Sequence, residues 1–207
     1  MTIPEMVQID DGTRVDHFYL SPQDDCYYFL EFVKGAGYGP TGNSFINNLK
    51  KAPSKRGTWE WSHKLAAIDS AAKAILRDVP RRWRERSTFV PIPPSKARGH
   101  VEYDDRMWQV LQRLGTDIDA RELVIQRQSM NATHVSENRH SIEMLVQNYE
   151  IDESKAFPIP THLVILDDMV TAGSHFRAIS RVLEARFPGV PISGVFLARR
   201  VFPNENV

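Results

Sequence analysis

The chain reads Leu163-Val164-Ile165-Leu166-Asp167-Asp168-Met169-Val170-Thr171-Ala172-Gly173-Ser174-His175 at the point that decides its fold. Four consecutive apolar residues, Leu163 to Leu166, are typical of a strand that is buried on both faces of a parallel sheet. An acidic pair and a loop of small residues follow. The apolar residues of 176–187 then lie three or four positions apart, which predicts a helix. A strand, a loop and a helix in this order form the repeating unit of an α/β fold.

The acidic pair and the loop after it offer two kinds of contact at one edge of the predicted sheet. Open α/β sheets bind ligands beyond the carboxyl ends of their strands, where we expect Asp167 and Asp168. The loop opens a helix, whose free backbone N–H groups and positive dipole end attract anions. Carboxylates that accept from hydroxyl groups therefore lie beside a cradle for phosphate, and a sugar phosphate presents both groups.

This segment resembles the signature of the type I phosphoribosyltransferases, in which an apolar strand, two adjacent acids and a Thr/Gly-rich loop precede a helix. The resemblance implies that Asp167 and Asp168 are the catalytic pair that holds the ribose hydroxyls of phosphoribosyl pyrophosphate (PRPP). It also implies that the loop cradles the 5-phosphate through Thr171, Ala172, Gly173, Ser174 and His175. In that family a hydroxyl residue usually stands in place of Ala172, and Thr or Ser in place of His175.

Two other interpretations of the acidic pair remain open. Aspartate suits turns because its side chain accepts hydrogen bonds from loop amides, so the pair can be a purely structural end to a buried strand. An aspartate nucleophile of a phosphatase or receiver-type site is the other interpretation. Such acids usually follow the first strand of a domain, whereas this pair lies near the C-terminus.

A second segment places basic and hydroxyl side chains directly after another short strand. It reads Phe89-Val90-Pro91-Ile92-Pro93-Pro94-Ser95-Lys96-Ala97-Arg98-Gly99. Lysine supplies a point charge for phosphate, and arginine supplies a bidentate fork. The segment resembles the pyrophosphate loop of the ComF-like branch of the phosphoribosyltransferases, which implies that Ser95, Lys96 and Arg98 bind pyrophosphate. An exposed basic turn without a ligand is the alternative.

A polar stretch between two predicted core strands, 126–147, is a candidate lid, because long insertions of this kind often close over a ligand. Its Ser136-Glu137-Asn138-Arg139 portion loosely resembles the mobile loop of the ComF-like branch, which implies a contact between Arg139 and pyrophosphate. His134 or His140 would assist the leaving group. Exposed polar residues without a role are an equal alternative.

The segment Tyr103-Asp104-Asp105-Arg106 opens a predicted helix at 104–114. We expect both acids to cap that helix, because Asp is favoured at the N-cap and in the first turn. Arg106 has a second interpretation as a ligand-binding residue.

Composition indicates an ordinary globular chain. Its 207 residues include 26 Lys plus Arg and 26 Asp plus Glu, so the formal net charge is zero and strong non-specific attraction to nucleic acid is not expected. No apolar run reaches the roughly 20 residues of a membrane-spanning helix, and the N-terminus does not resemble a signal peptide. The single cysteine, Cys26, fits a reducing, cytoplasmic setting, and its aromatic neighbours indicate a packed thiol and not a nucleophile.

The chain divides into two predicted regions. Residues 1–58 are expected to form a β-rich extension or hood, with strands at 15–20, 26–33 and 45–49. Residues 59–207 are expected to form the core, in which strands and helices alternate: strands at 89–93, 123–125, 163–166 and 192–198, and helices at 60–76, 104–114 and 176–187. The predicted fold class is α/β, with a parallel, Rossmann-like and phosphoribosyltransferase-like sheet that has helices on both faces.

The expected function is PRPP-dependent transfer of phosphoribose to a base or amine with release of pyrophosphate. Mg²⁺ is the expected cofactor, bound through PRPP and through Asp167 and Asp168. A non-catalytic sensor of PRPP or a nucleotide is the main alternative, favoured by Ala172 and His175. A nucleic-acid-linked effector with basic surfaces at 50–56 and 77–86 is a third interpretation. A homodimer is compatible with the sequence.

Overall fold

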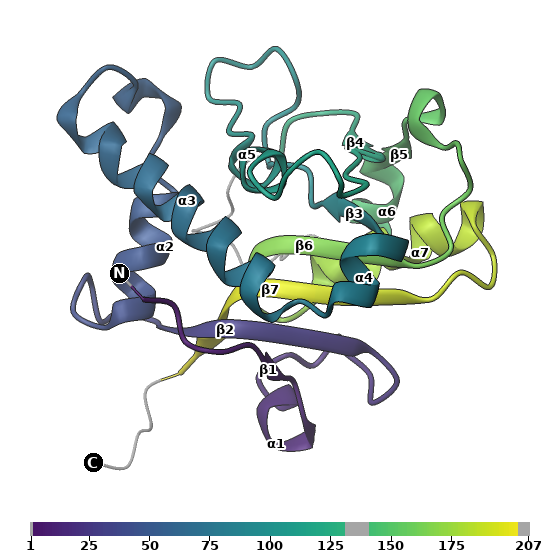
Figure 1. The fold of residues 1–207 in the computed structure, drawn as a ribbon, viewed down its shortest axis with the longest axis horizontal. Helices are drawn as coiled ribbons and strands as arrows, with labels where there is room; N and C mark the ends of the chain where they lie inside the picture. Colours follow the sequence, from purple (N-terminus) through teal and green to yellow (C-terminus); the bar gives the residue numbers. More distant parts are fainter. Residues whose placement is uncertain (1, 131–140, 203–207) are drawn as a thin grey trace.

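The computed structural model describes residues 2–130 and 141–202. Figure 1 shows β2, β7 and β6 side by side across the molecule. The strands are β1 (Val7–Gln8), β2 (Asp25–Val33), β3 (Thr88–Pro91), β4 (Val124–Gln126), β5 (Tyr149–Ile151), β6 (Leu163–Val170) and β7 (Ile192–Val201). The helices are α1 (Asp11–Arg14), α2 (Thr41–Leu49), α3 (Trp59–Asp78), α4 (Arg81–Arg86), α5 (Arg106–Gln112), α6 (Ile142–Asn148) and α7 (Ser174–Arg186), with 3-10 turns at Pro53–Lys55 and Glu153–Lys155.

Five strands form the main sheet, in the order β1-β2-β7-β6-β3. β1 pairs with β2 in antiparallel fashion, and every other neighbouring pair in this sheet is parallel. The carboxyl ends of β2, β7, β6 and β3 therefore lie along one edge, which is the edge where α/β sheets bind ligands.

Helices cover both faces of the main sheet and create two hydrophobic cores. One core contains apolar residues of α2, α3 and α5, and the other contains those of α6 and α7. β6 serves both cores alternately, with Val164 and Leu166 in the first and Leu163 and Ile165 in the second. Burial of alternate side chains on opposite faces explains why this run is uniformly apolar. The predicted α/β class with a mostly parallel sheet is confirmed.

The N-terminal region contributes to the same sheet. β2 lies between β1 and β7, and Cys26 of β2 stands opposite Gly194 of β7. The strand predicted at 26–33 is therefore confirmed. The strand predicted at 15–20 is wrong, because those residues form turns after α1.

The strand predicted at 45–49 is also wrong, since these residues belong to helix α2. Phe45, Ile46 and Leu49 share one helical face and are buried in the first core, together with residues of β2. Gly42 allows the helix to approach β2 closely, because a Cβ at this position would lie only 2.0 Å from the backbone oxygen of Glu31. The helical spacing of the apolar residues, and not their β-propensity, decides the local structure.

The strand predicted at 123–125 forms, as β4, but it does not join the main sheet. β4 pairs with β5 in a separate antiparallel sheet of two strands. Beside β3, the backbone of Phe89 bonds instead to Asp119 and Arg121. The apolar residues Leu123 and Val124 come after the segment that bonds to Phe89. Their side chains pack in the second core.

None of the described helices combines the length and apolarity that crossing a membrane requires. Cys26 is 1% exposed, and burial raises the pKa of its thiol. The prediction of a packed thiol is confirmed.

Candidate functional site

A pocket of about 430 Å³ lies at the carboxyl ends of β3 and β6. Residues 91–98, which end β3 and follow it, form one part of its wall, and residues of β6 and the loop after it form another. The two segments singled out in the sequence therefore meet in one cavity. The predicted site residues that line it are Ser95, Lys96, Arg98, Asp167, Asp168, Thr171 and His175.

The acidic pair lies within β6, which continues to Val170 rather than ending at Leu166. Asp168 is buried, whereas Asp167 is partly exposed. β6 stays paired with β7 on both sides of the acids, with Asp167 opposite Phe196. A paired strand therefore fixes the backbone of both acids, and their side chains leave the strand in opposite directions.

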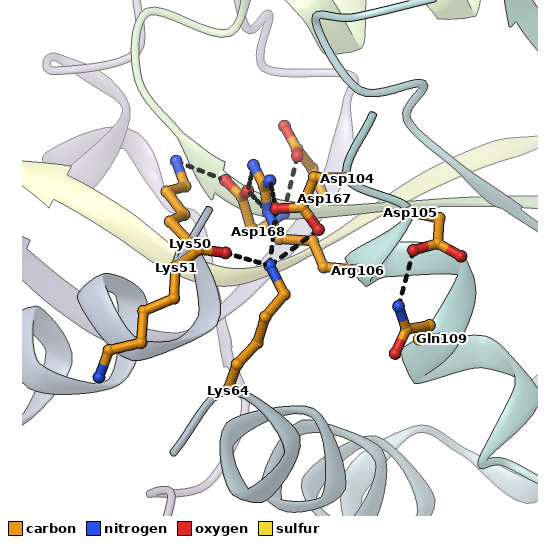
Figure 2. Close-up of polar contacts among 9 residues, drawn as sticks. All are labelled: Lys50, Lys51, Lys64, Asp104, Asp105, Arg106, Gln109, Asp167 and Asp168. Atoms are coloured by element: carbon orange, nitrogen blue, oxygen red, sulfur yellow. Dashed lines mark hydrogen bonds and ion pairs between the residues drawn. The ribbon is translucent and has the colours of Figure 1, made fainter. Parts of the chain in front are cut away.

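Both carboxylate oxygens of Asp168 contact cations (Figure 2). Lys50 Nζ lies 2.9 Å from Oδ1, and Arg106 reaches Oδ2 with Nε at 2.7 Å and Nη2 at 2.5 Å. Burial by itself would raise the pKa of Asp168, but Arg106 and Lys50 outweigh burial and hold this pKa below its ordinary value. Asp168 is therefore an anion at neutral pH.

Asp167 has the opposite electrostatics. It makes no ion pair with any residue of 2–130 or 141–202, and its Oδ1 accepts a hydrogen bond of 2.7 Å from the backbone N–H of Asp168. Burial, and after it the negative charge of Asp168, raise the pKa of Asp167 to about 7, although Lys50 and Arg106 act in the other direction. One acid of the pair is held ionised, and the other gains or loses a proton near neutral pH.

Asp104 is not the helix cap predicted from the sequence. The α5 helix begins at Arg106, and Asp105 stands at its N-cap without a side-chain capping bond. Asp104 is buried and accepts hydrogen bonds from Lys64 and from Arg106, at 2.7 Å and 2.6 Å. Charged partners outweigh capping here, because a buried carboxylate without a cation is strongly destabilising.

The loop after β6 turns sharply at Gly173, whose φ of +90° is unfavourable for residues with a side chain. The neighbouring Leu20 adds a steric restriction, because a Cβ on Gly173 would lie 2.9 Å from its Cδ2 atom. The α7 helix begins at the next residue, Ser174, two residues earlier than predicted. Ala172, Gly173 and Ser174 do not line the pocket, so in this loop Thr171 faces it.

Residues of the N-terminal region form hydrogen bonds with the backbone of this loop. The backbone N–H of Tyr19 donates to the oxygen of Ala172 at 2.9 Å, and Nδ1–H of His17 donates to the oxygen of Thr171. His17 is fully buried, and burial lowers the pKa of its imidazole, which favours a neutral ring. These contacts fix the backbone of the predicted phosphate loop.

His175 is exposed at the pocket and contacts Tyr149 of β5 through Nδ1, at 2.7 Å from the phenol oxygen. Burial, and then the charge of Asp167, raise the pKa of Tyr149, so the phenol stays protonated. His175 therefore joins the first turn of α7 to the two-stranded sheet.

The loop after β3 is held through its backbone. Ser95 accepts hydrogen bonds of 2.7 Å at its backbone oxygen from Gln126 Nε2 and from the N–H of Met130. Arg98 forms an ion pair of 2.6 Å with Glu122, so its charge is already compensated. Lys96 lines the pocket and has no ion pair within the described part of the chain, which makes it the better placed of the two cations for an anionic ligand.

The third predicted element lies outside the described residues. Arg139, His134 and His140 all fall in 131–140, and their predicted roles remain predictions.

Four of the nine cations of the two predicted basic surfaces form ion pairs with acidic partners among the described residues. Lys50 pairs with Asp168, and the other pairs are Lys55 with Glu60, Arg77 with Asp78 and Arg81 with Glu85. Such pairing reduces the charge that these surfaces present to a polyanion.

Lys50 and Lys64 contribute to the site although the sequence patterns do not indicate it. Lys50 belongs to a basic run that is typical of a solvated turn, yet it reaches Asp168. Lys64 is fully buried, whereas the apolar residue beside it in the predicted helix, Leu65, is 36% exposed. The alanines and isoleucines of α3 carry a usable signal, since Ala67, Ile68 and Ala71 lie on the same face as position 64.

The described residues contain no group of three or more His, Cys, Asp or Glu side chains arranged to hold a metal ion. The sequence matches no protein-family model, and a search of curated proteins finds no match.

Proposed function

We propose that the protein binds PRPP in this pocket and transfers its phosphoribosyl group to a nitrogen acceptor, in a core that is similar to the phosphoribosyltransferase fold. One observation carries the proposal: a cavity at the carboxyl ends of two parallel strands is lined by the acidic pair, by Thr171 of the loop before α7 and by the Ser-Lys-Ala-Arg loop. A ligand with hydroxyls between two phosphorylated positions matches this distribution of groups.

Each group has a defined task in the proposed complex. Asp167, in its ionised form, accepts from the ribose hydroxyls, since it is the acid of the pair without a cation partner among the described residues. Thr171, which lines the pocket just before α7, binds the 5-phosphate through its hydroxyl group. Lys96 binds the pyrophosphate, and Arg98 adds a second cation when it exchanges Glu122 for phosphate oxygens.

The transfer needs little covalent chemistry from the protein. The bond from ribose C1 to pyrophosphate breaks, and its electron pair leaves with the pyrophosphate oxygen. The bond from C1 to the acceptor nitrogen forms as that nitrogen loses a proton to solvent. Lys96 stabilises the charge that develops on the leaving group, and Asp167 offsets the positive charge on the sugar.

The donor set is compatible with Mg²⁺ held jointly by the protein and PRPP. Mg²⁺ in phosphate sites commonly uses one or two carboxylates together with substrate oxygens. Asp167 lines the pocket without a cation partner in the described ranges and fits this requirement, whereas both oxygens of Asp168 already contact cations. When bound, Mg²⁺ would supply positive charge to the pyrophosphate.

Calorimetry with PRPP and Mg²⁺, combined with a pyrophosphate-release assay over a panel of bases and amines, tests the proposal. We expect saturable binding, and release of pyrophosphate with at least one acceptor. The double variant Asp167→Asn/Asp168→Asn should weaken PRPP binding by about a hundredfold, the loss of roughly 2.7 kcal/mol. The exposed Asp11→Asn is the matched control and should bind like the wild type. Unchanged binding in the double variant would contradict the proposed site.

A non-catalytic PRPP sensor is a second candidate, which the paired state of Asp168 favours. Only one acid of the pair is available to a diol in this structure, and transfer enzymes with this motif are expected to use both. Tight PRPP binding without pyrophosphate release from any acceptor would support the sensor and contradict transfer.

A further inference from the structure

A lysine stands inside the core on the face of α3 that packs against other elements. Lys64 is fully buried, on the same helical face as Ala67, Ile68 and Ala71. A buried ammonium is costly unless every donor has a partner, and an apolar side chain of similar length would avoid this cost. Lys64 therefore has a use that apolar packing does not provide.

The first connection of Lys64 runs through Asp104 to Arg106 (Figure 2). Lys64 Nζ donates to both carboxylate oxygens of Asp104, at 2.8 Å and 2.7 Å. Asp104 in turn accepts from Arg106 Nη1 at 2.6 Å, while Nε of the same guanidinium donates to Asp168. Asp104 thus fixes the guanidinium on the side away from Asp168, and Lys64 fixes Asp104.

The second connection runs through the main chain. Lys64 Nζ also donates to the backbone oxygen of Lys51, at 2.8 Å. The preceding residue, Lys50, places its ammonium 2.9 Å from the other oxygen of Asp168. The chain that leaves α2 is therefore attached to α3 next to the residue that reaches the pocket.

Both connections start at Lys64 Nζ. One ends at Oδ1 of Asp168 and the other at Oδ2. Lys64 donates three hydrogen bonds, which is the full capacity of an ammonium group. It does not line the pocket, whereas Lys50, Arg106 and Asp168 all do. Any effect of Lys64 on a ligand must therefore pass through these neighbours.

We infer that Lys64 is a positioning residue of the pocket, which holds Lys50 and Arg106 on either side of Asp168 through Lys51 and Asp104. The inference rests on the proposed function for its ligand, PRPP, but its structural content, the placement of Lys50 and Arg106 around Asp168, does not depend on a ligand. Asp168 then acts as the counter-ion of two pocket cations, and Asp167 as the acid that is open to the ligand.

The test compares Lys64→Met with Lys73→Met, which removes an exposed lysine from the same helix. In the full chain we measure PRPP affinity with Mg²⁺ and the ¹⁵N NMR signal of the Arg106 Nε–H group, assigned by its loss in Arg106→Lys. Lys64→Met should weaken PRPP binding about tenfold and should shift the Arg106 signal or increase its exchange with water. Lys73→Met should change neither.

A double-mutant cycle separates positioning from a general loss of stability. If Lys64 acts through Asp168, Lys64→Met should have little further effect on PRPP affinity in an Asp168→Asn background. Independent, additive losses would overturn the inference. If Lys64→Met does not fold, Lys64→Gln retains an amide donor without the charge and should give the same coupling.

The two proposals fail in different ways. Absence of PRPP binding by the wild type contradicts the proposed function, and the Arg106 signal still tests the positioning role. An Arg106 signal that is identical in Lys64→Met, Lys64→Gln and the wild type overturns the inference, whatever the ligand.

Discussion

Two neighbouring carboxylates of β6 have opposite charge behaviour, although they share a sequence environment. Asp168 contacts two cations, which keep its pKa low, and Asp167 has a pKa raised to about 7 by burial and by Asp168. The difference in pKa arises because Lys50 and Arg106, which are distant in the sequence, contact Asp168 and not Asp167.

This difference predicts a pH-dependent effect of Asp167→Asn on stability. An acid whose pKa is raised by folding favours the folded state at low pH, and its contribution is lost as the pH rises from about 4, the value in the unfolded chain, to about 7. Asp167→Asn should therefore stabilise the ligand-free protein by about 2 kcal/mol at pH 8 and by less at pH 5. The gain at pH 8 is limited because the side chain is partly exposed to solvent.

Urea denaturation of the wild type and of Asp167→Asn at pH 5, 6, 7 and 8 measures this difference in the free energy of unfolding. A difference that is constant over these four pH values would contradict the raised pKa. Asp11→Asn, which removes an exposed carboxylate, controls for the loss of one negative charge.

At the scale of elements, the β6–α7 unit depends on the geometry of one glycine. Gly173 has a positive φ and also lies against Leu20, whereas Gly189, after α7, has a φ of +79° and open space within 4 Å of the point that a Cβ would occupy. Both glycines relieve backbone strain, but only Gly173 also relieves a steric contact. The two positions therefore form a matched pair.

We expect Gly173→Ala to lower the free energy of unfolding by about 2 to 3 kcal/mol, and Gly189→Ala by about 1 kcal/mol. The larger loss follows from the contact with Leu20, because either Leu20 or the loop must move. Chemical denaturation of both variants measures the effect. Equal losses would show that the packing of Leu20 against the loop has no energetic role.

Local patterns predicted the elements whose stability depends on local sequence. The apolar run of β6 and the helical spacing of α7 are of this kind, and both elements formed within a few residues of their predicted bounds. The ion pairs around Asp168 join residues 50, 64, 104, 106 and 168. No spacing rule covers contacts between such distant positions, which is why the partners of Asp168 were missed.

The errors at α2 and β4 have a different origin. A short apolar segment is compatible with a helix or a strand, and α2 became a helix because the packing against β2 selected one face of it. The predicted strand at 123–125 was real, but its partner, β5, depends on the path of the chain and not on the composition of the strand. The type of a short element and the pairing of a strand thus both depend on tertiary contacts.

At the scale of the whole molecule, β2 integrates the N-terminal region into the sheet. β2 has neighbours on both sides, β1 and β7, and its Cys26, Phe29 and Leu30 are buried. A fragment of residues 59–207 would expose the pairing edge of β7 and the apolar surface that these residues cover. We expect this fragment to lack a cooperative unfolding transition.

Circular dichroism during thermal or urea denaturation of the fragment and the full chain checks this expectation. The opposite outcome is cooperative unfolding of the fragment, with a dependence of its unfolding free energy on urea concentration (m-value) that is in proportion to its length. This outcome would show that residues 1–58 are dispensable for the core. In that outcome the extension predicted from the sequence would be a separable unit.

The parallel pairing of β2 with β7 also sets the order in which the molecule is completed. β2 is synthesised early, whereas its partner residues on β7, 193–201, are synthesised much later. Asp25, for example, can pair with Ser193 only after most of the chain has been made. Until then both apolar faces of β2 lack their final cover. Contacts so far apart in the chain are expected to slow folding and to leave this strand exposed until β7 has been synthesised.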